Sequence, residues 1–295
     1  MQAMLLAAGL GTRLRPYTQL RPKPLFPVRC QPLLLQLLDT LETAGFTKIT
    51  VNCHHLADQV VAAVQGRARL QVEAQILGTG GALRQALDAF EDEPLLVMNG
   101  DIHHRIDLAE AVAHHRHTGN AVTMVLHDLP RFNTVAVRDD RVTGFEPGQH
   151  GRKLAYTGVQ IIEPAVLEQI PRQSYHHIID LYREIAPTGA IGMVETSAAW
   201  CDIGTVADYL GLHATLLAAR QRWQIAPDAA VATDVLFEEW GVIGSGARIG
   251  RACRLRRCVV WDGAEIPPGA DLEDALVCGD PLLDCQLPGW PGTCP

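Results

Sequence analysis

Residues 5–18 read LLAAGLGTRLRPYT, and residues 21–24 read RPKP. The apolar start of this stretch predicts a buried strand, and the glycines that follow predict a tight exit from that strand. Glycine lets backbone N–H groups approach an anion closely, and the arginines and the lysine add permanent positive charge for phosphate oxygens. We therefore predict a polyphosphate-binding loop. The alternative interpretation is a tight strand exit whose arginines are solvated.

This loop differs from two widespread phosphate-binding motifs. Leu14 stands where the dinucleotide-binding fingerprint needs its third glycine. The chain also contains no G-x-x-x-x-G-K-[ST] sequence, which a P-loop requires. The charged glycine loop therefore predicts a phosphate site of another type.

Short apolar runs alternate with helical patterns from the N-terminus to about residue 220. Strands are expected at residues 2–8, 48–53, 70–76, 95–99, 121–127, 134–137, 155–162 and 189–195. Helices are expected at residues 32–44, 57–64, 80–90, 108–117 and 205–220. This alternation predicts an α/β fold with a mostly parallel sheet. Because such sheets bind ligands beyond the carboxyl ends of their strands, the loops at 9–24, 77–81 and 99–103 should share one cleft.

The pattern changes after Arg222, where apolar residues recur every six positions and small residues fall four places after several of them. A six-residue repeat of this kind is typical of a left-handed hexapeptide β-helix, in which stacked coils bury the repeated face. We therefore expect two domains, residues 1–222 and 223–295. An irregular tail rich in valine and glycine is the alternative. The repeated apolar positions are Ile225, Val231, Phe237, Ile243, Ile249, Leu255, Val260, Ile266 and Leu272, with a one-residue slip before Val260.

Composition excludes several classes of protein. Hydrophobic residues make up 47% of the 295 residues and charged residues 20%, which is ordinary for a folded globular protein. A net charge of −8 argues against broad adhesion to nucleic acid or to anionic membranes. No apolar run is long enough to span a membrane, and the N-terminus lacks the basic segment of a signal peptide. We expect a cytoplasmic protein whose eight cysteines, which form no C-x-x-C, are reduced thiols.

The sequence from residue 6 to residue 16, LAAGLGTRLRP, together with PKP at 22–24, resembles the signature of the sugar-1-phosphate nucleotidyltransferases. These enzymes make nucleoside-diphosphate sugars. Four further segments agree in order: LGTGGAL at 77–83, NGD at 99–101, YTGV at 156–159 and WCDIGT at 200–205. The resemblance spans residues 6–205 and implies a Rossmann-like nucleotidyltransferase core.

The resemblance implies that a sugar-1-phosphate oxygen attacks the α-phosphorus of a nucleoside triphosphate and that pyrophosphate leaves. It assigns Arg13 to the β- and γ-phosphates, and Lys23 to the α-phosphate and the sugar phosphate. It also assigns Asp101 and Asp202 to a catalytic Mg²⁺, an ion that prefers oxygen ligands. In isolation, Asp101 reads as an Asx-turn residue and Asp202 as a helix N-cap.

The remaining site residues also follow from the resemblance. The amide of Gln75 suits the pairing edge of uracil, thymine or guanine, so the base stays open. Sugar contacts are expected from Asn99, Thr157 and Gly158. The expected nucleotide contacts are Leu6, Ala7, Ala8, Gly9, Gly11, Thr12, Arg13, Gln75, Thr79, Gly80 and Gly81.

One element of the family is missing. Many relatives carry a Glu-Lys-Pro lysine that grips the sugar phosphate, but residues 144–148 read GFEPG here. Arg152 and Lys153 are candidate substitutes. Most of the twelve histidines are interpreted as surface or packing residues, because an ionised phosphate nucleophile needs no general base. His103 is the exception that lies nearest the expected metal.

Several functions remain open at this stage. Within the family, the chain resembles both the N-acetylmuramate-1-phosphate uridylyltransferases and the mannose- and heptose-1-phosphate guanylyltransferases. A choline-phosphate cytidylyltransferase and a non-catalytic nucleotide-sugar-binding regulator are alternatives. The expected partners are a nucleoside triphosphate and a sugar 1-phosphate, without nucleic acid or membrane. Assembly of a homo-oligomer through the C-terminal β-helix also stays open.

Overall fold

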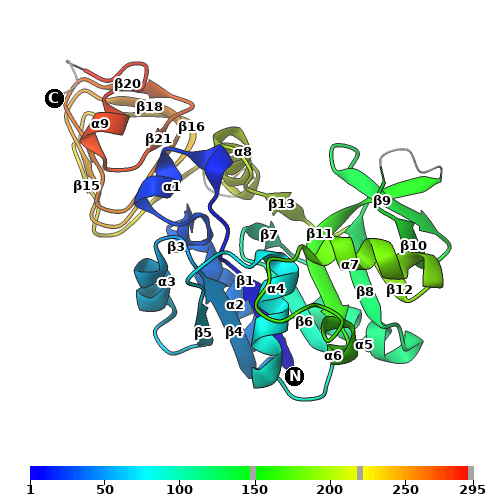
Figure 1. Cartoon of the computed structure of the whole chain (residues 1–295). Helices are drawn as coiled ribbons and strands as arrows, with labels where there is room; N and C mark the ends of the chain where they lie inside the picture. Colours follow the sequence, from blue (N-terminus) through cyan, green and yellow to red (C-terminus); the bar gives the residue numbers. More distant parts are fainter. Residues whose placement is uncertain (147–150, 218–221, 292–295) are drawn as a thin grey trace. The chain divides into compact units, whose positions relative to one another are not determined.

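A computed structural model describes residues 1–146, 151–217 and 222–291. The chain divides into two compact units (Figure 1). The first, called the sheet unit here, comprises Met1–Leu10 and Leu34–Trp200. The second, called the coil unit, comprises Gly11–Leu33 and Cys201–Pro295. The glycine-rich loop thus groups with the C-terminal residues, while the expected domain boundary after residue 222 stays a prediction.

The sheet unit is built on nine strands in the order β5-β4-β1-β6-β11-β8-β12-β10-β9. Neighbours among β5, β4, β1 and β6 are parallel, as are β8 and β12. The pairs β6–β11, β11–β8, β12–β10 and β10–β9 are antiparallel. The sheet is therefore mixed, with three of its parallel pairs in the first half and one more at β8–β12. The strands are β1 (Gln2–Leu6), β4 (Lys48–Cys53), β5 (Arg69–Val72), β6 (Leu95–Asn99), β8 (Val122–His127), β9 (Asn133–Arg138), β10 (Arg141–Gly144), β11 (Arg152–Ile162) and β12 (Ile191–Thr196).

Local connections explain the antiparallel half. A two-residue turn at 139–140 joins β9 to β10, and so short a turn can only join antiparallel strands. Parallel neighbours need a longer crossover, which α2 and α3 supply around β4. The helices and the remaining short strand are α2 (Leu33–Thr43), α3 (Ala57–Val64), α4 (Gly78–Ala86), α5 (Leu108–Thr118), α6 (Pro164–Leu167), α7 (Ile178–Ile185) and β7 (Ile102–His104).

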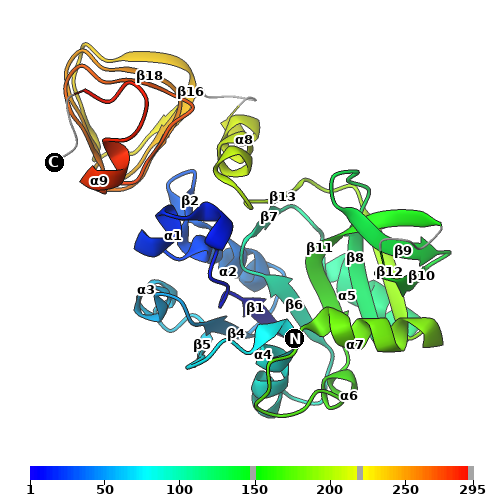
Figure 2. The same ribbon diagram turned by 45° about the horizontal axis from the view of Figure 1, so that its top comes forward.

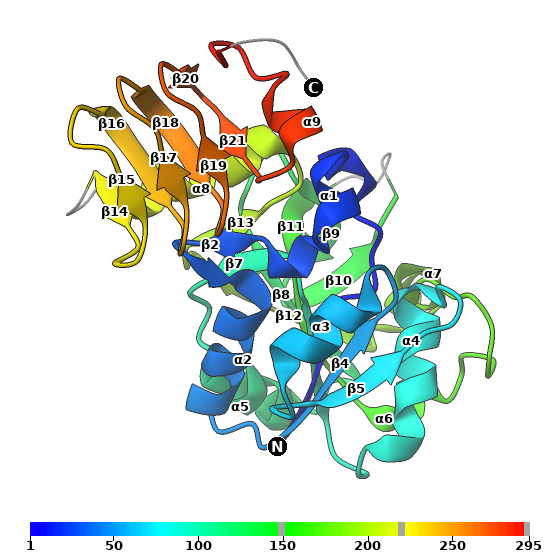
Figure 3. The same ribbon diagram turned by 90° about the vertical axis from the view of Figure 1, so that its left-hand side faces the viewer.

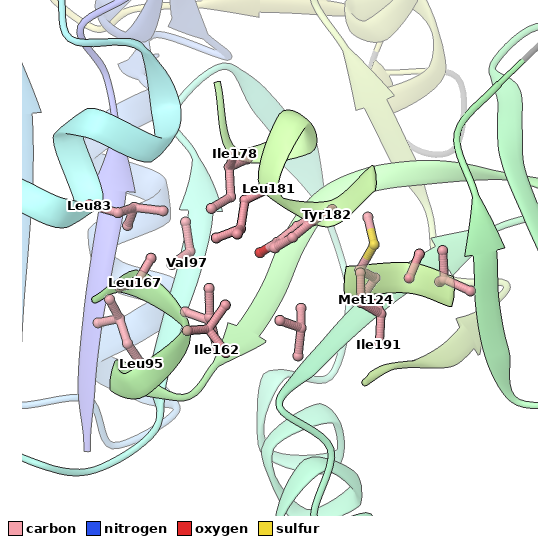
Figure 4. Packing of buried hydrophobic residues seen from close by; sticks show 14 of the residues in the cluster. Leu83, Leu95, Val97, Met124, Ile162, Leu167, Ile178, Leu181, Tyr182 and Ile191 are labelled. Carbon is pink, nitrogen blue, oxygen red and sulfur yellow. The ribbon is translucent and has the colours of Figure 1, made fainter. Parts of the chain in front are cut away.

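Helices cover both faces of this sheet. On one face α4, α6 and α7 contribute Leu83, Leu167 and Tyr182 to a buried cluster with Val97 and Met124 of the sheet (Figure 4). On the other face α5 packs against β8, β11 and β12. Because both faces are buried, these strands read as almost continuous apolar runs. That property made β4 and β6 predictable to the residue.

The C-terminal part of the coil unit consists of stacked parallel strands. One ladder runs β14-β16-β18-β20 and another runs β15-β17-β19, with β21 beside β18 (Figure 3). Paired residues are 18 apart for Trp223 and Gly241, and 17 apart for Arg254 and Asp271. Seen end-on, the successive turns follow one triangular outline (Figure 2). The elements are β14 (Trp223–Ile225), β15 (Ala230–Val231), β16 (Leu236–Ile243), β17 (Arg248–Ile249), β18 (Arg254–Val260), β19 (Glu265–Ile266), β20 (Asp271–Glu273), β21 (Leu276–Val277) and α9 (Pro281–Asp284).

The six-residue repeat lines the interior of this stack. Ile243, Ile249, Leu255, Val260, Ile266 and Leu272 are all buried, together with the small residues Ala247, Cys253, Ala264 and Ala270. The first repeat position differs, because Ile225 is 38% exposed. The one-residue slip of the repeat coincides with a register shift between β16 and β18, where the pair offset falls from 18 to 17 residues. A local bulge therefore absorbs the missing residue.

The rest of the coil unit comes from two distant stretches of chain. The first contains η1 (Thr12–Leu14), α1 (Tyr17–Leu20), η2 (Lys23–Leu25), β2 (Pro27–Val28) and β3 (Gln31–Pro32). The second contains α8 (Val206–Leu217), which follows β13 (Trp200–Asp202); the expected helix residues 218–220 lie outside the described part. Among the described helices, none is long and apolar enough to cross a membrane.

Six of the described cysteines agree with the expectation of reduced thiols. Cys30, Cys53, Cys201, Cys253, Cys258 and Cys278 are free thiols. Cys285 is disulfide-bonded, so the expectation of reduced cysteines is wrong there. Cys294 lies outside the described residues. Spacing alone carried no signal for this bond, because the chain has no recognisable disulfide framework.

His104 of β7 is buried in a site that suits the neutral imidazole. Its Nδ1 accepts a hydrogen bond from the N–H of Ile106 at 3.1 Å, and its Nε2 lies 2.9 Å from the sulfur of Met98. Burial lowers the pKa of His104 to about 4, and the charges of His103 and Arg105 add to this effect. Protonation at Nδ1 would remove the acceptor that Ile106 uses.

The truncation Leu255→Ala should strongly destabilise the stacked strands. Leu255 is fully buried in the stack, and removing a buried leucine side chain typically costs about 2–5 kcal/mol. Leu236→Ala is the matched control, because Leu236 lies on the neighbouring strand β16 and is 61% exposed. Urea unfolding followed by tryptophan fluorescence measures both. Equal losses in the two variants would contradict the assignment of this interior.

The buried His104 should make stability depend on pH. Its folded pKa of about 4 lies below the ordinary 6.5, so the unfolded chain binds more protons between these values. The free energy of unfolding should therefore fall as the pH decreases from about 6.5 to about 4, by on the order of 3 kcal/mol at about 1.4 kcal/mol per pKa unit. Urea titrations at pH 7 and pH 4.5 should show a smaller fall in His104→Gln. If the free energy of unfolding of His104→Gln fell as much as that of the wild type, the pH dependence would belong to other groups.

Candidate active site

A lysine, an arginine and an aspartate meet in the coil unit. The Nζ atom of Lys23 lies 3.1 Å from Oδ1 of Asp202, and Nη2 of Arg13 lies 3.6 Å from Oδ2 of the same carboxylate. The Lys23 side chain is only 7% exposed, whereas that of Arg13 is 66% exposed. Three of the four residues expected to carry catalysis are thus neighbours, although Asp202 is 179 residues from Lys23 in sequence.

The loop conformation explains how Lys23 and Arg13 reach this carboxylate. The carbonyl of Gly11 accepts hydrogen bonds from the N–H of Leu14 and the hydroxyl of Thr18, which closes the turn that contains Arg13. Lys23 begins the short helix η2, and its carbonyl accepts from the N–H of Phe26.

Gly204 lies where a side chain would disturb this group. A Cβ atom there would lie 2.9 Å from both Nη1 of Arg13 and Oδ2 of Asp202. Absence of a side chain at Gly204 therefore allows the pair to form.

The sheet unit brings a second set of expected residues together. Leu6 and Asn99 are register partners at the carboxyl ends of β1 and β6. The N–H of Gly100 donates to the carbonyl of Leu6 at 2.8 Å, which holds the turn that precedes Asp101 against the end of β1. Asp101 is half-buried in this turn. The residues Ala7, Ala8 and Gly9, expected to contact nucleotide, continue from the same strand end.

Two of the expected sugar-contacting residues lie beside each other. A Cβ atom on Gly158 would lie 2.7 Å from Nδ2 of Asn99. Thr157 is different, because it is 1% exposed and its hydroxyl donates to the carbonyl of Val125 at 2.7 Å. Its carbonyl accepts from the indole of Trp200 at 2.7 Å. In the described structure the side chain of Thr157 therefore fastens β11 to β8.

The glycines at 78–81 have a packing partner within the protein. The N–H groups of Gly80 and Gly81 both donate to the carbonyl of His176, at 2.9 and 3.1 Å. A Cβ atom on Gly81 would lie 2.4 Å from the carbonyl oxygen of Ser174. The hydroxyl of Thr79 accepts from the N–H of Ile178. The close approach of residues 174–178 thus explains why this helix start is so rich in glycine.

A chain of buried hydrogen bonds links three strand ends, and sequence reasoning missed it. The N–H of Ala7 donates to Oδ1 of Asn52 at 2.7 Å, and Nδ2 of Asn52 donates to Oε1 of Glu73 at 2.7 Å. The other oxygen of Glu73 accepts from the N–H of Leu77 at 3.2 Å. Polar residues at the ends of two apolar strands were the available signal. Gln75, which was expected to recognise the base, is exposed between these anchored points.

The candidate metal and phosphate residues outside these groups are readily placed. Arg152, a candidate for the missing lysine, donates to the carboxylate of Glu195 with both terminal nitrogens. Pro147 and Gly148 of the corresponding segment lie outside the described residues. His103 is 9% exposed, and burial lowers its pKa with the help of Arg105. No group of three or more metal-ligating side chains occurs in the described part of the chain.

Comparison with known proteins identifies the family of this chain. The family model named Nucleotidyl transferase matches residues 2–219. Probable mannose-1-phosphate guanylyltransferase 1 of Oryza sativa subsp. japonica is 28% identical over 309 residues, covering 94% of this chain and 86% of that protein. UTP–glucose-1-phosphate uridylyltransferase of Synechocystis sp. is 32% identical over 238 residues, covering 71% of this chain and 61% of that protein.

A solved structure shows the same fold. HddC from Yersinia pseudotuberculosis complexed with GMP-PN superposes with a TM-score of 0.62 at 24% identity, covering 73% of this chain and 99% of that one. The family match spans the glycine-rich loop, both strand-end turns and Asp202. The chain therefore belongs to the nucleotidyl transferase family of enzymes, among the sugar-1-phosphate nucleotidyltransferases.

Proposed function

We propose that this chain transfers a nucleotidyl group from a nucleoside triphosphate to a sugar 1-phosphate in a Mg²⁺-dependent reaction. Membership of the family supports the reaction class. The observation that carries the proposal is the buried Lys23 ammonium held by Asp202, with the exposed guanidinium of Arg13 beside it. A purely structural ion pair between Lys23 and Asp202 would not explain why Arg13 of the glycine-rich loop also lies beside the Asp202 carboxylate.

The reaction needs charge neutralisation more than covalent catalysis. An oxygen of the sugar phosphate forms a bond to the α-phosphorus, and the bond between the α-phosphorus and the bridging oxygen breaks. The electron pair leaves with pyrophosphate, and no proton moves because the nucleophile is already ionised. Lys23 binds the α-phosphate and the sugar phosphate, and Arg13 binds the β- and γ-phosphates. Each such contact is commonly worth about 10²–10³ in turnover.

Asp101 and Asp202 are the residues that would hold a Mg²⁺ ion, as the family resemblance implies. Both are half-buried, and hard oxygen ligands suit this metal. Mg²⁺ commonly takes one or two carboxylates and completes its coordination with phosphate oxygens and water. The ion supplies positive charge at the triphosphate. Asp202 would exchange at least one of its present contacts, with Lys23 or Arg13, for the metal.

The neutral part of the proposed site uses backbone groups. The loop from Ala8 to Thr12 offers backbone groups to the triphosphate. Leu6 and Ala7 are further nucleotide contacts, although the N–H of Ala7 is already bonded to Asn52. Gln75, Thr79, Gly80 and Gly81 surround the base, and Asn99, Thr157 and Gly158 the sugar. Thr157 would act through its backbone, because its hydroxyl is buried and bonded. The N–H groups of Gly80 and Gly81 already donate to His176, so these two N–H groups are not available to the base.

We further propose GTP as the nucleotide donor. The relatives that match along most of this chain are guanylyltransferases: two from Oryza sativa subsp. japonica cover 94% and 99% of it. The uridylyltransferase from Synechocystis covers 71%. The longer matches extend through the stacked C-terminal strands, and this extent of similarity favours guanylyl transfer.

We propose that the C-terminal strands form a left-handed hexapeptide β-helix. Offsets of 17 and 18 residues between paired strands support this proposal, because three six-residue repeats make one coil of 18. Homo-oligomer formation through these coils and a cytoplasmic location stay predictions.

Pyrophosphate release should identify the reaction. With Mg²⁺ and pooled sugar 1-phosphates, we expect release with GTP and little with UTP, CTP, dTTP or ATP. Phosphocholine in place of the sugars tests the cytidylyltransferase alternative. Release with UTP alone would replace the guanylyl assignment by a uridylyl one. A folded protein that binds nucleotide but releases no pyrophosphate with any pair would be a regulator rather than an enzyme.

Asp101→Asn should keep the fold but lose turnover, by about 10²–10³. Asp202→Asn should lose at least as much turnover and should also lower stability, because it leaves the buried Lys23 ammonium without its opposite charge. The amide keeps the shape of the carboxylate but removes the charge that attracts a metal. Asp88→Asn is a matched control, because Asp88 is 63% exposed and pairs with Arg172 on the surface. Steady-state rates against Mg²⁺ concentration measure the effect. Near-normal rates in both site variants would contradict the metal assignment.

A further inference from the structure

Trp261 of the β-helix lies at the centre of the contacts made by the glycine-rich loop segment. Its indole is 1% exposed and packs edge-to-face on Phe26, with ring centroids 4.8 Å apart, and on Tyr17 at 6.2 Å. The guanidinium of Arg21 lies over the same indole, 4.7 Å from its centroid. Three residues of the segment that carries Lys23 thus touch one side chain.

Asp262, the next residue, holds Arg21 from the other side. Two parallel hydrogen bonds join Nη1 and Nη2 of Arg21 to the two oxygens of Asp262, at 2.7 and 2.9 Å. Burial opposes the charge of Asp262, but the hydrogen bonds and charge of Arg21 outweigh it, so the pKa of Asp262 lies below its usual value. A bidentate arginine–carboxylate pair fixes orientation as well as distance.

Further contacts fix the remainder of the loop segment. The indole N–H of Trp261 donates to the hydroxyl of Tyr209 at 3.2 Å, and Tyr209 donates to the carbonyl of Pro27. The hydroxyl of Tyr17 donates to the carbonyl of Leu276 at 3.5 Å. The same compact unit therefore contains the loop segment Gly11–Leu33 and the C-terminal coils.

Arg21 is connected to the proposed catalytic residue Lys23 by a short and stiff stretch of backbone. The sequence between them is Arg21-Pro22-Lys23-Pro24, and each proline ring locks its own φ and restricts the residue before it. Few backbone rotations remain to absorb a displacement of Arg21. Movement of Arg21 is therefore transmitted to Lys23, whose ammonium must stay within reach of Asp202 and the α-phosphate.

We propose that Trp261 and Asp262 of the β-helix are positioning residues for Lys23. They act through Arg21 and the Pro22 ring, and they do not touch the substrates. The proposal rests on the proposed function of Lys23. It makes the C-terminal coils part of the catalytic apparatus, in addition to any role in assembly.

Asp262→Ala should lower kcat by about tenfold or more, because small displacements of a positioned group cost up to about 10²-fold. The KM for the triphosphate should change by less than about twofold, since Arg13 and the loop backbone are left intact. Glu265→Ala is the matched control: it removes a carboxylate that pairs with Arg248, 3.5 Å away, on the same coils. Equal kcat values for Asp262→Ala and Glu265→Ala would overturn the proposal.

A double-mutant cycle separates positioning from a general loss of stability. Arg21→Ala should lower kcat to a similar extent, and the double variant should be no slower than either single one, because both remove the same contact. A double variant whose loss of kcat equals the product of the two single losses would overturn the proposal. Trp261→Phe, which keeps an aromatic ring but loses the bond to Tyr209, should give a smaller decrease in kcat than Asp262→Ala.

Hydrogen exchange tests the same proposal without catalysis. The N–H groups of Leu25 and Phe26 donate to Pro22 and Lys23, so their protection reports the conformation around Lys23. Asp262→Ala should speed their exchange by about tenfold or more, and Glu265→Ala should leave it unchanged. If the wild-type protein releases no pyrophosphate, the proposed function fails. Faster exchange in Asp262→Ala would still show that Asp262 holds the segment around Lys23 in place. Unchanged exchange in Asp262→Ala would overturn the positioning role.

Discussion

The arrangement of the coil unit depends on the contact between the Lys23 ammonium and the Asp202 carboxylate. A buried ammonium is unstable unless an opposite charge compensates it, so Lys23 can occupy its position only when residues near 202 are folded around it. The glycine-rich loop and the chain after β13 must therefore fold together. Truncating either partner would leave a charge buried without compensation, which is more costly than the pair is stabilising.

The residues expected at the site stand on two kinds of structural support. Strand ends of the sheet unit present neutral groups, and the hydrogen bonds from Ala7 through Asn52 and Glu73 to Leu77 hold three of these ends in register. The coil unit presents the permanent charges of Arg13, Lys23 and Asp202. A reaction that joins two polyanions needs both rigid backbone donors and placed cations.

Much of this architecture was predictable because it depends on local pattern. Runs of buried residues defined β4 and β6 to the residue, and the six-residue repeat identified the interior of the coils from Ile243 onward. Other features were not. The helix α7 lacked a sequence prediction, and the glycines at 78–81 were interpreted as space for a base although residues 174–178 pack directly on them. Periodicity reports which face of an element is buried, but it does not report which distant segment covers that face.

The sequence by itself determined the α/β pattern, the repeat and the residue types suited to binding phosphate and metal, because these follow from local spacing and side-chain chemistry. The resemblance to a family assigned roles to Arg13, Lys23, Asp101 and Asp202. Only the tertiary structure decided that Gly11–Leu33 groups with the C-terminal coils and that Trp261 and Asp262 hold Arg21. These partners are separated by about 240 residues, and contacts over such separations arise from packing and charge compensation in the folded chain, which local sequence patterns do not encode.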